Sequence, residues 1–416
     1  MSSEVFPPPP PLSEPSPQSV VRRGVAGFLS VALGVWLANA VLSLASDSMV
    51  VWLANDSLVG WLGWVAVPAL LMAVVVYGLM GLTRMVPKRF FLPLVLCGPL
   101  TALAALPVMI YFHRESAWIS WGMSAVQALV CVVVIYRLRG ARGVEWPFFR
   151  VEQLEARGFT WGNTLGFAAV NALVLVPAAA VYLISCGGLA VDHFTGGFVA
   201  LRPAGVTMQV RKYVREDGKT VELVPMSHIG EAEFYQTLAA SFSPTAAVLM
   251  EGVSDREHLL TEKVGYGKTA RDLGLAEQQA AFKPKGELVP ADVDISEFSK
   301  VTLECLKRTM VVHAQGINAA TLPVLMQPAP EDLPEKLMED LLEKRNAHVL
   351  GVLEERLRTT DHVIIPWGAA HMPGISAGVL KAGFRLLATE DHVAIRFGEA
   401  RGGSNDGLPG HRRPDS

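Results

Sequence analysis

Five long apolar runs dominate the first half of the chain. They cover roughly residues 24–45, 58–82, 90–112, 117–136 and 163–187, and none carries a charge in its middle. A helix that crosses a bilayer needs about 20 mostly apolar residues, and each run meets that length. The sequence therefore predicts an α-helical membrane region of about five transmembrane helices. Four or six spans are the alternatives, because prolines interrupt the second and third runs.

The number of charged residues rises abruptly after about residue 190. Only 8 of the 39 acidic residues lie in residues 1–190, while Lys and Arg divide 11 to 25 between residues 1–190 and 191–416. We therefore expect a transmembrane region over residues 21–190 and a globular domain over residues 191–397. The Pro-rich residues 1–20 and the polar residues 398–416 are predicted to be disordered tails. The sequence has no basic stripe of the kind that binds nucleic acid, and so no nucleic-acid partner is expected.

The basic residues of the short loops predict an orientation. Arg22 and Arg23 precede the first apolar run, and the loop that follows this run has no Lys or Arg. The second and fourth loops are rich in them, whereas the third has only Arg114. We therefore expect an integral protein of the plasma membrane, in contact with the lipid bilayer, with a cytoplasmic N-terminus. An odd number of spans then places the globular domain outside the cytoplasm.

The polar half reads as alternating strands and helices. Residues 196–226 have strand-like alternation with an Asp-Gly hairpin signal at 217–218, and two further apolar runs precede Glu251 and His371. His228 and His371 each stand between a predicted strand and a predicted helix. The sequence thus predicts an α/β domain with a mixed sheet.

Three predicted strands end in groups that bind metals or move protons, namely His228, Glu251 and His371. In sheets flanked by helices, ligands gather at the carboxyl ends of strands. Imidazole and carboxylate suit Zn, Mn or Co, and such an ion can activate a water molecule for attack on an amide or ester. Taken singly, each histidine could equally be a helix cap, and Glu251 could simply begin a turn.

The polar half resembles the TraB/TIKI/PrgY superfamily over roughly residues 196–397. The resemblance rests on "GAAH" at 368–371, on Glu251 in "VLMEGVSD" and on Arg345 with Asn346 in "EKRNAH". The first histidine motif, "PMSH", has Pro225 where the family usually has glycine, although His228 is in place. Asp292 and Asp294 look like a family segment with a secondary, structural role. The membrane region lies outside the resemblance.

The resemblance implies a compact α/β domain that is a metal-dependent peptidase or related hydrolase. His228, His371 and Glu251 would be metal ligands, with Glu251 as ligand or as catalytic base, and Arg345 would steady an oxyanion or orient Glu251. From the sequence alone, Arg345 could instead form an exposed salt bridge on a helix. The resemblance leaves one alternative function, a non-catalytic module that sequesters a secreted peptide or haem. The hypothesis of transport through the helices has less support, because the predicted spans lack charged residues near the middle of the membrane.

Overall fold

The structure is a computed structural model, and it describes residues 17–140, 146–155, 158–260, 265–316, 318, 320–325, 327, 329–330 and 332–398. The chain forms two compact units that divide between Leu189 and Ala190, and each is described by itself. Of the two predicted tails, residues 1–16 and 399–416 lie outside the described residues. Residues 17–20 of the predicted N-terminal tail belong instead to the first helix.

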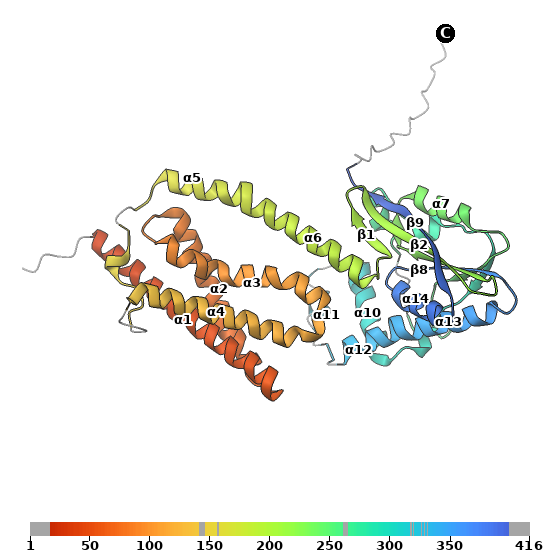
Figure 1. Cartoon of the computed structure of the whole chain (residues 1–416), viewed down its shortest axis with the longest axis horizontal. Coiled ribbons are helices and arrows are strands. Elements are labelled where there is room, and N and C mark those ends of the chain that lie inside the picture. The colour runs from red at the N-terminus through yellow and green to blue at the C-terminus, as the bar shows by residue number, and fades with distance from the viewer. Residues whose placement is uncertain are drawn as a thin grey trace, which may run out of the picture. The chain divides into compact units, whose positions relative to one another are not determined.

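The first unit contains five helices long and apolar enough to cross a membrane, as predicted. Prolines do not end the second and third helices, because Pro68 lies inside α2 and three more prolines lie inside α3. The fifth helix contains a π-helical turn over Asn171–Leu175. This turn lies just before Pro177, which has no N–H to bond a carbonyl one turn back. The helices (Figure 1) are α1 Pro17–Leu53, α2 Val59–Leu82, α3 Lys88–Tyr111, α4 Ser116–Arg139, α5 Trp161–Val170 and α6 Val176–Phe194.

The helical unit is apolar on its outer surface as well as in its core. Leu29, Val76, Phe91 and Ile135 are fully buried between α1, α2, α3 and α4. Large apolar side chains also face outward, among them Trp52, Trp61, Trp64, Leu70, Leu129, Leu173 and Ile184. A helix that is hydrophobic all round is typical of a bilayer environment. The first unit is therefore compatible with a membrane protein.

The second unit is built on one mixed sheet, as predicted. Its strand order is β1-β2-β3-β8-β5-β7, and β9 pairs with β2. Neighbours β3, β8, β5 and β7 are parallel, whereas β2 runs antiparallel to β1, β3 and β9. The strands are β1 Val199–Arg202, β2 Gly205–Val214, β3 Thr220–Met226, β5 Ala247–Met250, β7 Glu287–Pro290, β8 His362–Gly368 and β9 Arg385–Arg396; β4 Ile229–Gly230 and β6 Ala276–Glu277 form a separate pair.

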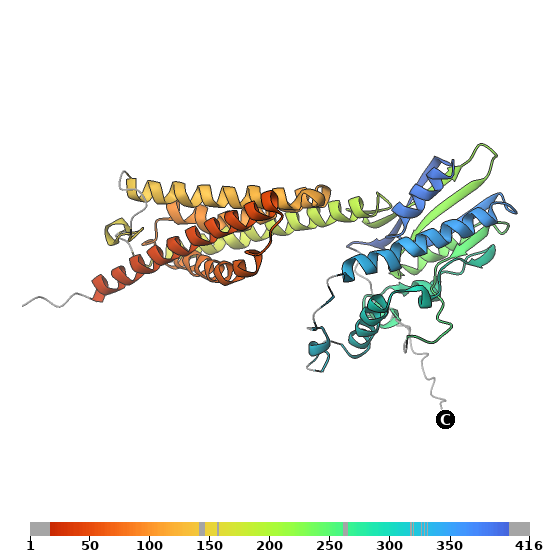
Figure 2. The same ribbon diagram turned by 90° about the horizontal axis from the view of Figure 1, so that it is seen from below.

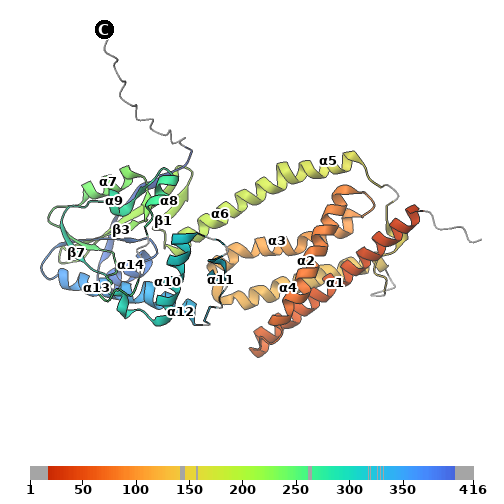
Figure 3. The same ribbon diagram turned by 180° about the vertical axis from the view of Figure 1, so that it is seen from behind.

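Helices cover both faces of this sheet (Figure 3). Alternate residues of β8 enter different cores: Ile364 packs with α7 Ala232–Ser241, whereas Val363, Ile365 and Trp367 pack with α13 Lys344–Arg356 and α14 Met372–Lys381. Because both faces of the central strands are buried, residues of either parity are apolar, and these strands appear in the sequence as continuous apolar runs. The remaining helices are α8 Gly267–Asp272, α9 Gln278–Ala281, α10 Lys300–Gln315, α11 Leu322–Leu325 and α12 Leu333–Met338. Figure 2 shows α13, in light blue, lying along the domain.

The four parallel strands bring polar side chains to one edge of the sheet. Because these strands share one direction, their carboxyl ends lie together, with Met226 opposite Gly368 and Met250 opposite Pro290. Glu251 follows β5 directly, His371 follows β8 by three residues, and Asp292 follows β7 by two. This edge is where the sequence places its candidate site.

Candidate active site

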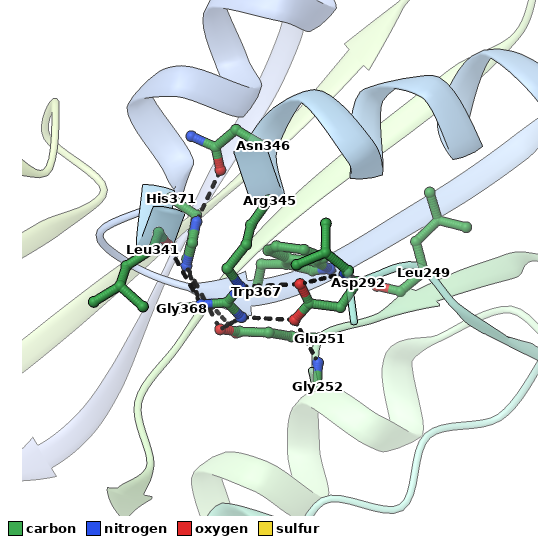
Figure 4. A network of polar contacts seen from close by, with 11 residues as sticks. Leu249, Glu251, Gly252, Asp292, Leu341, Arg345, Asn346, Trp367, Gly368 and His371 are labelled. Carbon is green, nitrogen blue, oxygen red and sulfur yellow. Dashed lines mark hydrogen bonds and ion pairs between the residues drawn. The ribbon is translucent and has the colours of Figure 1, made fainter. Parts of the chain in front are cut away.

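Glu251, Arg345 and His371 lie in one network of polar contacts (Figure 4). Arg345 Nη2 donates to Glu251 Oε1 at 2.8 Å, and Arg345 Nη1 lies 3.1 Å from His371 Nε2. His371 Nε2 and Glu251 Oε1 are 3.6 Å apart. Glu251 Oε2 also accepts the backbone N–H of Gly368 at the end of β8. The carboxylate after β5 and the histidine after β8 are therefore held together by one guanidinium.

Asp292 anchors the other side of the guanidinium. Its side chain is fully buried and accepts from Arg345 Nε at 2.9 Å and from Nη2 at 2.7 Å. The backbone N–H groups of Gly252 and Val293 complete its hydrogen bonds. Such a bidentate pair fixes a guanidinium in position and orientation. The expectation of a secondary role understates Asp292, which makes more contacts with Arg345 than Glu251 does.

All five N–H donors of Arg345 have an acceptor. Besides Asp292, Glu251 and His371, the carbonyl of Leu341 lies 3.5 Å from Nη1. Burial lowers the pKa of Arg345, but the hydrogen bonds and charges of Asp292 and Glu251 outweigh it and raise that pKa. Arg345 is therefore a charged and saturated clamp, and it cannot bind a substrate oxygen directly without giving up one of these contacts.

Local helix geometry directs Arg345 and Asn346 toward the strand ends. The helix that carries both residues has a π turn over Glu339–Glu343, directly before α13. Such wide turns are frequent at functional sites because they shift the helix face by part of a turn. The turn is fixed by Asp340, whose buried carboxylate accepts from Lys344 Nζ at 2.6 Å and from the Ser299 N–H.

Asn346 sets which ring nitrogen of His371 carries the proton. Its Oδ1 lies 2.8 Å from His371 Nδ1, so Nδ1 carries the proton and donates, while Nε2 accepts from Arg345. The imidazole is buried, and burial, aided by the charge of Arg345, lowers its pKa to about 4. His371 is therefore neutral at physiological pH, and its contact with Glu251 is not an ion pair.

Two glycines, Gly374 and Gly368, lie beside this arrangement. A Cβ on Gly374 of α14 would lie 2.4 Å from Asn346 Nδ2, so any side chain there would displace Asn346. A Cβ on Gly368 would lie 3.4 Å from Glu251 Oε2 and 3.6 Å from the His371 ring, which is ordinary contact. A methyl group would fit at 368, so Gly374 is the glycine of these two that the arrangement requires. Beneath the carboxylate and the imidazole, Trp367 is fully buried and donates from Nε1 to the Leu249 carbonyl.

His228 lies apart from the network. It is exposed, and its ring stacks on Tyr266 with centroids 4.7 Å apart. Within the described ranges, no hydrogen bond or ion pair joins it to Glu251, Arg345 or His371. The register also separates the two motifs: Pro225 of "PMSH" pairs with Trp367, one position before Gly368 of "GAAH". His228 and His371 therefore do not leave their strands at equivalent positions.

The described residues do not fit the predicted metal centre as they stand. In the parts of the chain that the structure describes, no three His, Cys, Asp or Glu side chains group so as to hold a metal ion. The lone pair of His371 Nε2, which a metal would need, accepts from Arg345. Binding of a Mn, Co or Zn ion by His228, His371 and Glu251 stays a prediction, and no step below depends on it.

Comparison with known proteins gives no assignment. No family model, no curated protein and no solved structure matches the chain. The resemblance to the TraB/TIKI/PrgY superfamily stays a prediction based on short motifs. Function must therefore be argued from the site itself.

Proposed function

We propose that the second unit is a hydrolase, most simply a peptidase, anchored by the helical unit. One observation carries the proposal: the strand-end carboxylate of Glu251 and the neutral imidazole of His371 face each other at 3.6 Å, held by the single clamp of Arg345. A carboxylate fixed at a sheet edge, beside a neutral imidazole and a fixed positive charge, is an arrangement that general-base hydrolysis can use.

Glu251 is the proposed base. Its side chain is 16% exposed, against 6% for His371 and none for Asp292, so it is the carboxylate that a water molecule can reach. Both its oxygens are fixed, one by Arg345 and one by the Gly368 N–H, and each retains a lone pair. A water bound there would lose its proton to Glu251 as it attacks an amide or ester carbonyl, and the protonated Glu251 would then give this proton to the leaving nitrogen or oxygen as its bond to the carbonyl carbon breaks.

Arg345 and Asn346 act as positioning residues in this scheme. The guanidinium has no spare donor, so its contribution to the reaction is its fixed charge beside the site and the geometry it imposes. Fixed charges that already point at developing charge stabilise a transition state without the reorganisation that water needs. Binding of a metal ion by Glu251, His371 and His228 would require His371 Nε2 to give up its contact with Arg345, and the scheme does not depend on it.

Peptide cleavage by the full-length chain in lipid nanodiscs tests the proposal. Mass spectrometry would follow a mixture of unstructured peptides and simple esters, with and without added Mn, Co or Zn. We expect Glu251→Gln to lower cleavage by about 10²- to 10⁴-fold. The exposed Glu257→Gln on the following loop is the matched control and should leave cleavage unchanged. Equal cleavage by Glu251→Gln and the wild type would refute the role of Glu251.

We further propose that the N-terminus is cytoplasmic and the hydrolase domain extracytoplasmic. The five apolar helices and the basic residues of alternate loops support this orientation. A cysteine introduced at the exposed Asp272, in a Cys305→Ser background, should react with a membrane-impermeant reagent in intact cells. Protection in intact cells and reaction only after lysis would reverse the orientation.

The saturation of Arg345 also favours a second candidate function. A network in which every guanidinium donor is used can hold the fold of a binding domain without taking part in chemistry. Such a domain would sequester a secreted peptide or haem. It would bind its ligand saturably and return it with unchanged mass, and Glu251→Gln would alter affinity alone.

A further inference from the structure

A cavity of about 200 Å³ lies among α1, α2, α3 and α4 of the helical unit. Small residues such as Ala40, Ala69 and Gly98 line it, and they leave space that larger side chains would fill. Its described lining residues belong to the apolar helices, and none of them is charged. Since a cavity of about 150 Å³ already holds a benzene ring, this one has room for a substituted ring.

The carboxamide of Asn39 lies at the wall of this cavity without a hydrogen-bond partner. Its Oδ1 is fully buried, and among the described residues nothing donates to Oδ1 or accepts from Nδ2. A half turn of the amide exchanges these two atoms, so either one can face the cavity. The polar group of Asn39 is therefore unused in the described part of the chain.

The other polar groups at this cavity join helices to one another. Gln127 Nε2 donates to Thr101 Oγ1 at 3.3 Å, and Trp36 Nε1 donates to the carbonyl of Ala69 at 2.9 Å. Polar side chains between membrane helices commonly hold the helices together in this way. Polar groups are costly inside a membrane and usually functional there, so the amide of Asn39 points to a ligand.

The cavity opens at the surface between α2 and α3. Its exposed lining residues are Leu70, which is 60% exposed, Ala66 and Pro99. A bilayer would cover this apolar surface with lipid chains, so a ligand that enters here must dissolve in the bilayer. An acyl chain alone would leave the amide of Asn39 unpaired, and a charged group would find no opposite charge in the described wall.

We propose that this cavity binds a neutral, lipid-soluble molecule through a ring that carries a hydroxyl, with the hydroxyl bonded to Asn39. A hydroxyl both donates and accepts, so it pairs with the carboxamide in either orientation. The proposal rests on insertion of the helical unit in a membrane. It is independent of the hydrolase function, because every described lining residue belongs to the helical unit.

Photolabelling of the full-length chain in nanodiscs tests the site. The probe is para-octylphenol with a diazirine on its first chain carbon, and peptide mass spectrometry locates the label. We expect label in the segments of α1, α2, α3 and α4 that line the cavity. Excess para-octylphenol should compete with the probe more strongly than octylbenzene, which lacks the hydroxyl. Label spread evenly over the apolar surface, or equal competition by the two compounds, would overturn the proposal.

Replacement of Asn39 tests the hydrogen bond. Asn39→Leu should weaken competition by para-octylphenol by roughly tenfold, which is the effect of one hydrogen bond, and should leave octylbenzene unaffected. The change removes an unpaired polar group, so the fold should be retained. The matched control is Asn55→Leu, at an exposed position beyond the end of α1, which should compete as the wild type does. Equal affinities for para-octylphenol in Asn39→Leu and Asn55→Leu would refute the role of Asn39.

Replacement of Gly98 tests the space. A Cβ on Gly98 meets nothing within 4 Å, so Gly98→Leu adds a side chain at the cavity wall without displacing a neighbour, and it should abolish specific labelling. The control is Gly122→Leu on α4, where a Cβ also meets nothing within 4 Å and which lies outside the cavity. Leucine favours a helix more than glycine does, so neither change should unfold the chain. Specific labelling of Gly98→Leu as strong as that of Gly122→Leu would contradict the proposed site.

Discussion

Removal of the Arg345 guanidinium should destabilise the strand ends more than any exposed charge change. In Arg345→Met, the fully buried Asp292 carboxylate keeps only the N–H groups of Gly252 and Val293, and Glu251 and His371 lose their shared donor. Breaking one side of a buried, hydrogen-bonded ion pair costs about 3–5 kcal/mol. Asp292→Asn in the same background removes the orphaned charge and should recover about 1–3 kcal/mol of this loss.

Hydrogen exchange measured by mass spectrometry on the full-length chain reports this effect locally. Since about 1.4 kcal/mol is a factor of ten, amides of β5 and β8 should exchange roughly 10²- to 10³-fold faster in Arg345→Met. The matched control is Arg356→Met on the same helix, which removes a half-exposed pair with Glu287 and should cost under about 1 kcal/mol. Exchange in Arg345→Met within threefold of that control would refute the interpretation of Arg345 as a clamp.

Two further predictions follow from the geometry around His371. Because burial holds the His371 pKa at about 4, below its unfolded value of roughly 6.5, the unfolded chain binds a proton first as the pH falls. As the pH falls from 6.5 to 4, His371 should therefore lower the stability of the domain by about 3 kcal/mol. Thermal scans of a His371→Gln variant should lack this part of the acid destabilisation. A pH profile of stability that is the same in the variant and the wild type would contradict this. Gly374→Ala should push Asn346 away from His371, lower any hydrolytic activity and destabilise the domain by about 1–3 kcal/mol. The exposed Gly351→Ala on α13, where a Cβ meets nothing, should be neutral or stabilising, and a similar loss in both variants would contradict the role of Gly374.

Periodicity and length were enough to predict both architectures. The five apolar runs correspond to five long helices, because the length and the apolar character of such a run can be counted directly from the sequence. The strands that lead to Glu251 and His371 were predictable because a buried parallel strand is a short apolar run that ends in polar residues. The ends of helices were less predictable, and α1 begins at Pro17, inside the predicted tail.

The composition of the site was only partly predictable. Glu251, Arg345 and His371 come together because of the order of the strands in the sheet, which local sequence does not give. Their convergence was expected only from the motif resemblance. The sequence indicated only a secondary role for Asp292 and none for Gly374, because Asp292 acts on Arg345 and Gly374 acts on Asn346, each more than 25 positions away along the chain. The two histidine motifs are offset by one residue in the β3–β8 register, and spacing along the chain does not encode this offset.

Hydrolysis in heavy-oxygen water tests the central role of Glu251 most directly. The full-length chain in nanodiscs would be incubated with a peptide that it cleaves, and the new carboxyl terminus would be analysed by mass spectrometry. Direct attack by water predicts one heavy oxygen in the new carboxyl terminus formed by the wild type and by Glu257→Gln, and product formation reduced by at least about a hundredfold in Glu251→Gln. Labelled product formed at the wild-type rate by Glu251→Gln would contradict it.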